Sequence, residues 1–128
     1  MSTRITQDIS IKVDCQFEAE HSDIIQNQFV FSYRIRIENH SSESVQLLSR
    51  HWYIFDSNGE YKEVKGEGVI GVQPIIDSGS SHEYQSFSNL STDIGMMWGS
   101  YLMKKLSNGK LFEAKIPEFH LITPNRLN

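Results

Sequence analysis

Apolar and polar residues alternate strictly in two segments of the first third of the chain. In residues 9–17 every second position is apolar, and in residues 29–37 the same period returns, with Ser32 among the polar positions. A period of two is typical of a β-strand with one face in the core and one in water. Cys15 lies on the apolar face, so we expect a buried small hydrophobic residue there and not a nucleophile.

Turn signals separate further strand candidates along the rest of the chain. We expect these strands at residues 45–55, 60–64, 82–87 and 112–116. Asn-Gly pairs at positions 58–59 and 108–109 are strong hairpin signals. Pro117 should end or bend the last strand, because proline donates no hydrogen bond to a β-ladder. Many short strands with regularly spaced turns predict an all-β sandwich or barrel.

The segment of residues 96–106 is ambiguous between helix and strand. Its methionines, leucines and lysines favour a helix, whereas Gly99 in its middle costs a helix about 1 kcal/mol. The hairpin turn that follows calls for a strand before it, so we expect a strand here. Alternation then sends one of two pairs into the core: Met97 and Tyr101, or Met96 and Trp98.

Composition and charge limit the classes of protein that remain. The 128 residues fit a single domain over residues 1–128, with the 38% apolar and 22% charged content of a globular protein. A single cysteine excludes an internal disulfide and a cysteine-rich zinc site. The net charge of −4 disfavours binding to nucleic acid or to a membrane surface, both of which rely on positive charge. No signal peptide or membrane span is recognisable, so we expect a soluble, cytoplasmic protein without membrane insertion.

Four stretches of the sequence resemble one known family. They read LLSRHWYIFDSNGE, EVKGEGVIGVQP, TDIGMMWGSYLM and FEAKIPEFHL. Together they are similar to the ApaG family, and the resemblance extends from about Ile9 to Leu121. It implies a single ApaG domain with an immunoglobulin-like, fibronectin type III-like β-sandwich of two antiparallel sheets.

The same resemblance implies a class of function. Bacterial ApaG proteins are associated with cobalt and magnesium resistance or efflux, and are often encoded beside a hydrolase of diadenosine polyphosphates. Related domains are fused into F-box proteins and a DNA-polymerase-interacting protein, where they look like interaction modules. No established enzymatic activity comes with the family. The leading hypothesis is therefore a non-enzymatic module without a cofactor that acts through an unidentified protein partner, and exposed edge strands make a homodimer plausible.

Residues 66–71 read Gly-Glu-Gly-Val-Ile-Gly and fit the G-x-G-x-x-G pattern. In a dinucleotide-binding fold this pattern follows a strand and opens a helix whose N-terminus binds pyrophosphate. Here Pro74 follows closely, the intervening residues are β-branched, and no helical period comes after them. The pattern alone therefore does not predict a dinucleotide site.

A weaker interpretation of the glycines is an anion-binding loop. Consecutive backbone N–H groups can form a concave site for phosphate or a nucleotide, and cations near in sequence would support it. The candidate residues are Gly66, Gly68, Gly71, Lys62 and Lys65. Glu67 within the loop would repel phosphate. The alternative is that the glycines serve a bulge or a crossover between sheets.

Arg50, His51 and Trp52 are the second candidate site. Arginine and tryptophan dominate interaction hot spots, so the three residues are candidates for binding a protein partner. The alternative is a tryptophan buried in the sandwich with Arg50 and His51 hydrogen-bonded at a sheet edge. The five histidines show no metal-ligand spacing and no catalytic serine motif is present, so neither a metal site nor a catalytic residue is assigned.

Overall fold

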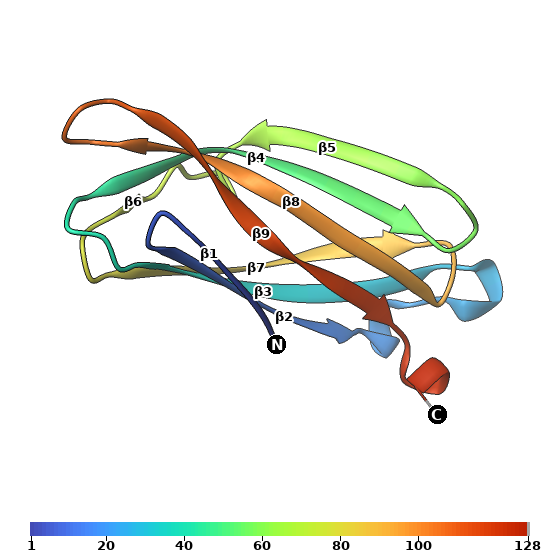
Figure 1. Ribbon diagram of the computed structural model, residues 1–128. Helices are drawn as coiled ribbons and strands as arrows, with labels where there is room; N and C mark the ends of the chain where they lie inside the picture. Colours follow the sequence, from blue (N-terminus) through green and yellow to red (C-terminus); the bar gives the residue numbers. More distant parts are fainter. Residues whose placement is uncertain (128) are drawn as a thin grey trace.

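The computed structural model describes residues 1–127 and consists of two antiparallel sheets packed face to face (Figure 1). The first sheet has the order β1 (Ser2–Thr6), β2 (Ile9–Phe17), β3 (Phe29–Asn39) and β7 (Ser81–Leu90). The second has the order β5 (Tyr61–Glu67), β4 (Val45–Asp56), β8 (Ile94–Lys105) and β9 (Leu111–Ile122), and the short β6 (Ile75–Ile76) also pairs with β4. Three short 3-10 turns are Ala19–His21, Ile24–Gln26 and Pro124–Leu127. The predicted all-β sandwich is confirmed.

The strand order is that of an immunoglobulin-type sandwich. Strands β2, β3 and β7 are neighbours in one layer, and β4, β8 and β9 are neighbours in the other, with β5 at its edge. The central strand β4 carries a buried Trp52, as the corresponding strand of immunoglobulin domains does. The ambiguous segment 96–106 is a strand, as expected, within β8.

Two bulges change which side chains face the core. The pairing of β4 with β8 shifts register at Leu48, and the pairing of β9 with β8 shifts at Pro117 and Glu118. Leu47 is buried before the first bulge, and Trp52 is buried after it, so the inward positions change from odd to even numbers. Pro117 therefore does not end its strand, which continues to Ile122 through the bulge.

Interlocking side chains from both sheets fill the core. Tyr33, Trp52 and Phe119 form an aromatic group with ring centroids 5.4–5.9 Å apart. Met97 and Tyr101 point inward, which settles the alternation of β8 in favour of that pair. The aliphatic part of the core consists of Ile9, Ile11, Val13, Ile35, Ile37, Val45, Leu47, Ile76, Leu90, Ile116 and Leu121, among others.

The burial of Ser32 and of Cys15 differs in detail from the prediction. Ser32 lies on the outer face of its sheet, yet it is only 5% exposed, because the segment after β2 covers it and Glu18 Oε2 accepts its hydroxyl hydrogen bond at 2.9 Å. Cys15 packs against the core as expected but is only partly buried, and its thiol donates to the His120 carbonyl at 3.2 Å. Burial raises the pKa of this thiol.

The two lateral sides of the sandwich are built differently. On one side, here called the closed side, β9 crosses over and packs against β1 and β2 (Figure 1). A backbone N–H of Lys115 in β9 donates to Thr6 Oγ1 at 3.2 Å there. On the opposite, open side, β5 and β7 are the edge strands of their sheets and do not pair with each other. The open side leaves room for a cavity between the sheets.

Candidate functional site

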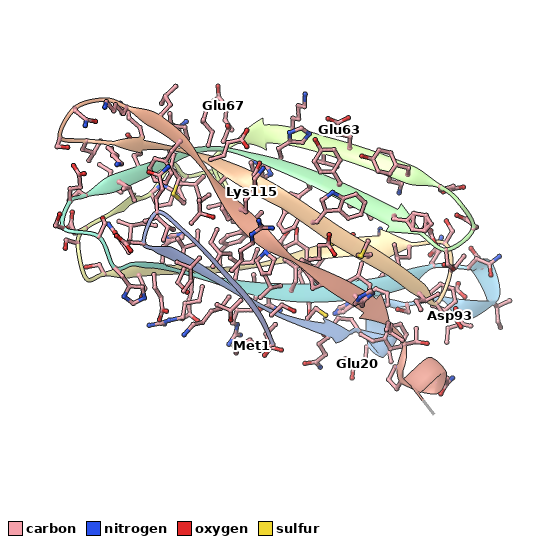
Figure 2. The ribbon with its side chains drawn as sticks, in the orientation of Figure 1. Met1, Glu20, Glu63, Glu67, Asp93 and Lys115 are labelled. Carbon is pink, nitrogen blue, oxygen red and sulfur yellow. The ribbon has the colours of Figure 1, made fainter. Side chains whose placement is uncertain are left out.

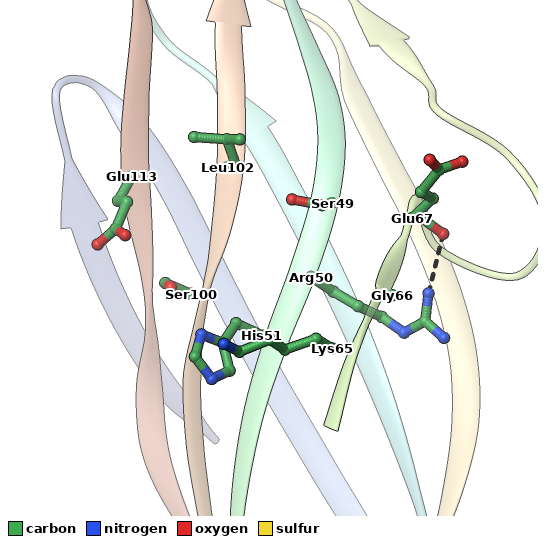
Figure 3. Close-up of a pocket in the computed structure, with 9 residues that line it drawn as sticks. All are labelled: Ser49, Arg50, His51, Lys65, Gly66, Glu67, Ser100, Leu102 and Glu113. Carbon is green, nitrogen blue, oxygen red and sulfur yellow. Dashed lines mark hydrogen bonds between the residues drawn. The ribbon is translucent and has the colours of Figure 1, made fainter. Parts of the chain in front are cut away.

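Arg50 lies on the inner face of β4, at the open side. It is the direct cross-strand partner of Gly66 in β5, and its guanidinium lies over that glycine. A Cβ at position 66 would come within 2.7 Å of Cζ and both terminal nitrogens of Arg50. Arg50 Nη1 donates to the Glu67 carbonyl at 2.9 Å (Figure 3) and to the Gly68 carbonyl at 3.0 Å. Gly66 therefore allows the guanidinium to lie flat against the end of β5.

The guanidinium borders a cavity of about 360 Å³ between the two sheets, here called the inter-sheet cavity. Strands from both sheets and the turn after β5 contribute to its wall. The lining residues are Tyr33, Arg50, Trp52, Glu67, Val69, Ile70, Gly71, Tyr84 and Ser86. The wall thus combines one cation, aromatic surfaces and hydroxyl groups.

Three phenols gather behind Arg50. The hydroxyls of Tyr84 and Tyr101 form a short hydrogen bond across the sandwich, from β7 to β8. Burial raises the pKa of Tyr33, Tyr84 and Tyr101, and the positive charge of Arg50 lowers each of them by a smaller amount. All three phenols therefore stay protonated and neutral at ordinary pH.

The segment after β5 is a tight turn. Val69 and Val72 exchange two backbone hydrogen bonds, of 2.8 Å and 3.1 Å, around Ile70 and Gly71, which both have positive φ angles of 46° and 78°. The N–H of Gly68 donates to the Leu48 carbonyl at 2.8 Å. A Cβ at Gly68 would lie 2.1 Å from the Val72 carbonyl oxygen, so this glycine is required by the close approach of the backbone. The N–H groups of Gly68, Val69 and Val72 are thus already engaged.

The structure separates the residues of the predicted anion-binding loop. Lys65 lies on the outer face of the second sheet, 3.6 Å from Glu63, whereas Gly71 lines the inter-sheet cavity. Lys62 is exposed and pairs with Ile54, on the opposite face of β5 from Lys65. The two lysines do not converge on the glycines, and the cation that approaches them is Arg50.

Arg50, His51 and Trp52 are likewise not brought together on one surface. Trp52 is 3% exposed and belongs to the core. Arg50 points into the sandwich beside it, and His51 points out to the opposite face (Figure 3). Alternation along β4 separates the three side chains, so only His51 of this group lies on the outer face of the sheet.

His51 belongs to an aromatic group on that outer face, here called the outer aromatic cluster. Its members are His51, Tyr53, Tyr61 and Trp98. Tyr53 stacks on His51 with centroids 4.5 Å apart, and on Trp98 at 5.6 Å with an angle of 9° between the rings. Tyr61 completes the group and is 54% exposed. Cross-strand pairing of β4 with β5 and β8 aligns these rings, and the cluster was not among the sites predicted from the sequence.

Charged residues and two hollows surround the outer aromatic cluster. Glu63 on β5 places Oε1 2.6 Å from Nε2 of His51, and Lys115 on β9 places Nζ 3.1 Å from Oε2 of Glu113 (Figure 2). One hollow, of about 450 Å³, lies between His51, Lys65 and Glu113. The other, of about 350 Å³, lies beside Tyr53 and Trp98. Opposite charges are paired along this rim, so it carries little net charge.

Residues 1–127 contain neither a metal-binding cluster nor a membrane-spanning helix. No group of three or more histidine, cysteine, aspartate or glutamate side chains in this part of the chain is arranged to hold a metal ion. None of the helical turns in the same residues has the length and apolar character needed to cross a bilayer.

The fold and its surfaces define a small immunoglobulin-like β-sandwich with a polar cavity between its sheets and an aromatic patch on one of them. The family model described as ApaG domain matches residues 19–105. The chain belongs to the ApaG family.

Relatives support this assignment over nearly the whole chain. The Protein ApaG of Vibrio vulnificus is 46% identical over 120 residues, which are 94% of each chain, and that of Pseudomonas fluorescens is 44% identical over the same shares. A crystal structure of a Bordetella pertussis protein assigned as ApaA superposes with a TM-score of 0.88 at 42% identity, covering 91% of this chain and 94% of that one. A second X-ray structure gives 0.89 at 34% identity, covering 98% and 94%. The names of these relatives state no catalytic activity.

Proposed function

We propose that this protein is a non-enzymatic binding module of the cytoplasm that docks a protein partner on its outer aromatic cluster. The observation that carries the proposal is the group of two tyrosines, a tryptophan and a histidine in ring contact on the outer face of one sheet. Tyrosine and tryptophan are enriched among residues that dominate protein–protein binding energies. Any link to cobalt and magnesium resistance would then run through the partner.

The rim of the cluster indicates the chemistry of this partner. Glu63 contacts both His51 and Lys65, and Glu113 contacts Lys115, so the neighbouring charges are largely neutralised. Such a rim offers little long-range attraction to a highly charged partner. It suits a folded protein that inserts an apolar or aromatic anchor into the hollow beside Trp98 and Tyr53.

Matched surface variants test the proposal. Tyr61→Ala removes an exposed ring of the cluster, and Phe87→Ala removes a ring of nearly equal exposure, 55% against 54%, from the other sheet. The wild-type protein and both variants are used as bait in native extract, captured proteins are identified by mass spectrometry, and binding of the purified candidate is then measured directly. We expect Tyr61→Ala to weaken this binding at least about tenfold, as for a hot-spot residue, and Phe87→Ala to leave it unchanged.

Two outcomes contradict docking on the cluster. One is equal binding by wild-type protein and Tyr61→Ala, and the other is equal loss in both variants. Circular dichroism of each variant checks that the sandwich is intact, since both side chains are exposed and neither contributes to the core.

A second copy of the chain is an alternative partner, through the free edge of β5. Antiparallel pairing of two β5 strands about Val64 would place Glu63 of each copy opposite Lys65 of the other, which favours the pairing. Light scattering over a range of protein concentrations tests this form of the proposal. A monomer at all concentrations would rule it out.

A further inference from the structure

The geometry points to a second binding site, distinct from the partner-binding surface: the inter-sheet cavity takes a small phosphate-class oxyanion, with Arg50 as the charged donor. This site lies on the opposite face of β4 from the outer aromatic cluster. It also differs from the predicted glycine loop, because the anion is held by side chains inside the sandwich instead of by loop amides and lysines.

The position of Arg50 is fixed before any ligand arrives. Nη1 is held by the carbonyls of Glu67 and Gly68, and the guanidinium lies against the Cα of Gly66. Within residues 1–127 these two carbonyls are the hydrogen-bond partners of the guanidinium, which leaves donors on Nε and Nη2. A planar guanidinium binds phosphate oxygens with paired hydrogen bonds, and less entropy is lost when the group is already held in place.

Neutral hydroxyls complete the donor set. Tyr84 and Ser86 project from β7 into the same cavity, opposite Arg50 on β4. The Tyr84 hydroxyl can accept a hydrogen bond from the fully buried Tyr101, which leaves its own proton to donate toward the cavity. Because burial keeps the phenols protonated, they add donors near the anion without adding negative charge.

The size of the cavity limits the ligand. Its volume of about 360 Å³ is at the lower end of the range of roughly 300–1,000 Å³ that is typical of small-molecule sites. A phosphate, a pyrophosphate or the phosphate end of a nucleotide fits such a volume better than an entire dinucleotide. The one carboxylate in the lining, that of Glu67, is exposed to water, and the atom that faces Arg50 is its backbone carbonyl.

The mouth of the cavity contains a strained residue. Ile70 is β-branched, has a φ angle of 46° and is 62% exposed, and it belongs to the lining of the cavity. A branched residue in the left-handed region is unfavourable, and such strain is concentrated at ligand sites. Exposure of this apolar side chain does not stabilise the fold. We therefore expect Ile70 to cover a ligand bound in the cavity.

Calorimetry with inorganic phosphate, pyrophosphate and adenosine monophosphate tests the site at fixed ionic strength. We expect saturable binding of pyrophosphate to the wild-type protein. Arg50→Gln should weaken it at least about tenfold, while the matched variant Lys65→Gln, which removes one positive charge from the adjacent strand, should change it less than about twofold. The phosphate and nucleotide arms distinguish a free inorganic anion from a nucleotide as the source of the phosphate group.

Arg50→Gln also removes contacts to two carbonyls, so a second variant guards against a general loss of structure. Ser86→Asp keeps the arginine and adds a carboxylate at the cavity wall, so it should abolish pyrophosphate binding, and circular dichroism checks that the sandwich is intact. Three results overturn the inference: no saturable binding to wild type, equal weakening by Arg50→Gln and Lys65→Gln, or unimpaired binding by Ser86→Asp. Loss of partner binding in Tyr61→Ala with unchanged pyrophosphate binding would show that the two sites are separate.

Discussion

The closed and open sides of the sandwich have different kinds of residue between the two sheets. On the closed side β9 lies across β1 and β2, and the residues between the sheets are aliphatic, with Ile9, Ile11 and Ile116 at most 2% exposed. On the open side the space between β4 and β7 contains Arg50, Tyr33 and Tyr84 around a cavity. The closed side thus contributes mainly hydrophobic stabilisation, while the open side keeps polar groups inside the fold, where they are available to a ligand.

The largest expected effect is on the closed side. Ile11→Ala removes a completely buried side chain from β2 and should lower the free energy of unfolding by about 2–5 kcal/mol. The exposed neighbour Asp14, changed to alanine, should alter it by less than about 0.5 kcal/mol. Urea denaturation measures both. Similar effects at the two positions would contradict the assigned register of β2.

A smaller effect is expected on the open side, from the phenol pair. Tyr84→Phe leaves the buried Tyr101 hydroxyl without its partner, which should cost about 1–3 kcal/mol. Tyr84→Phe combined with Tyr101→Phe removes both hydroxyls, and should therefore cost clearly less than the sum of the two single changes. The same denaturation experiment on the four proteins gives the coupling energy. Strict additivity would mean that the two hydroxyls do not interact.

The smallest effect is the loss of stability at the onset of alkaline pH, near pH 10, and it separates the two sides. Burial raises the pKa of Tyr84 and Tyr101 above the ordinary value of 10.0, so the folded state holds protons that the unfolded state releases. Their stabilising contribution is complete below pH 10 and is lost as the pH rises above it, by about 0.4 kcal/mol for each phenol at pH 10 and up to about 1.4 kcal/mol per further pH unit.

On the closed side, burial also raises the pKa of the Cys15 thiol above its ordinary value of 9.0, so this group too stabilises the fold less as the pH rises. Its loss should therefore begin about one pH unit earlier than that of the phenols. Melting temperatures between pH 8 and 11 are compared for wild type, Cys15→Ala and the double phenylalanine variant. We expect the double variant to flatten the decline above pH 10 and Cys15→Ala to affect the range nearer pH 9. A decline that is identical in all three proteins would place the titrating groups elsewhere.

The sequence predicted most of the strands because burial on one face leaves a period of two. Segments 9–17 and 29–37 are correctly assigned for this reason. Strand β1 was missed, since its residues are mostly exposed and it is held by backbone pairing with β2 instead of by side-chain burial. The family assignment was also available from the sequence, because the motifs extend over nearly the whole chain.

The candidate sites could not be predicted in the same way. The bulge at Leu48 exchanges the inward and outward positions of β4. A bulge is defined by the pairing with the partner strand, so the alternation of residues in β4 alone does not predict it. The sequence therefore offered Arg50 as a partner-binding residue or as a residue hydrogen-bonded at a sheet edge, whereas in the structure it points into the sandwich. The outer aromatic cluster depends on register between β4, β5 and β8, and its residues are too far apart in sequence to form a motif.

The close approach of Arg50 to Gly66 also constrains how the sequence can change over evolution. While an arginine occupies position 50, a side chain at position 66 would push its guanidinium away from the Glu67 and Gly68 carbonyls, so substitutions of this glycine are disfavoured one at a time. If a small residue replaced the arginine first, position 66 would be free to vary. The order of the two substitutions therefore matters. A lineage that gave up the cation would be expected to lose the glycine afterwards, and a lineage that regained the cation would have to restore the glycine first.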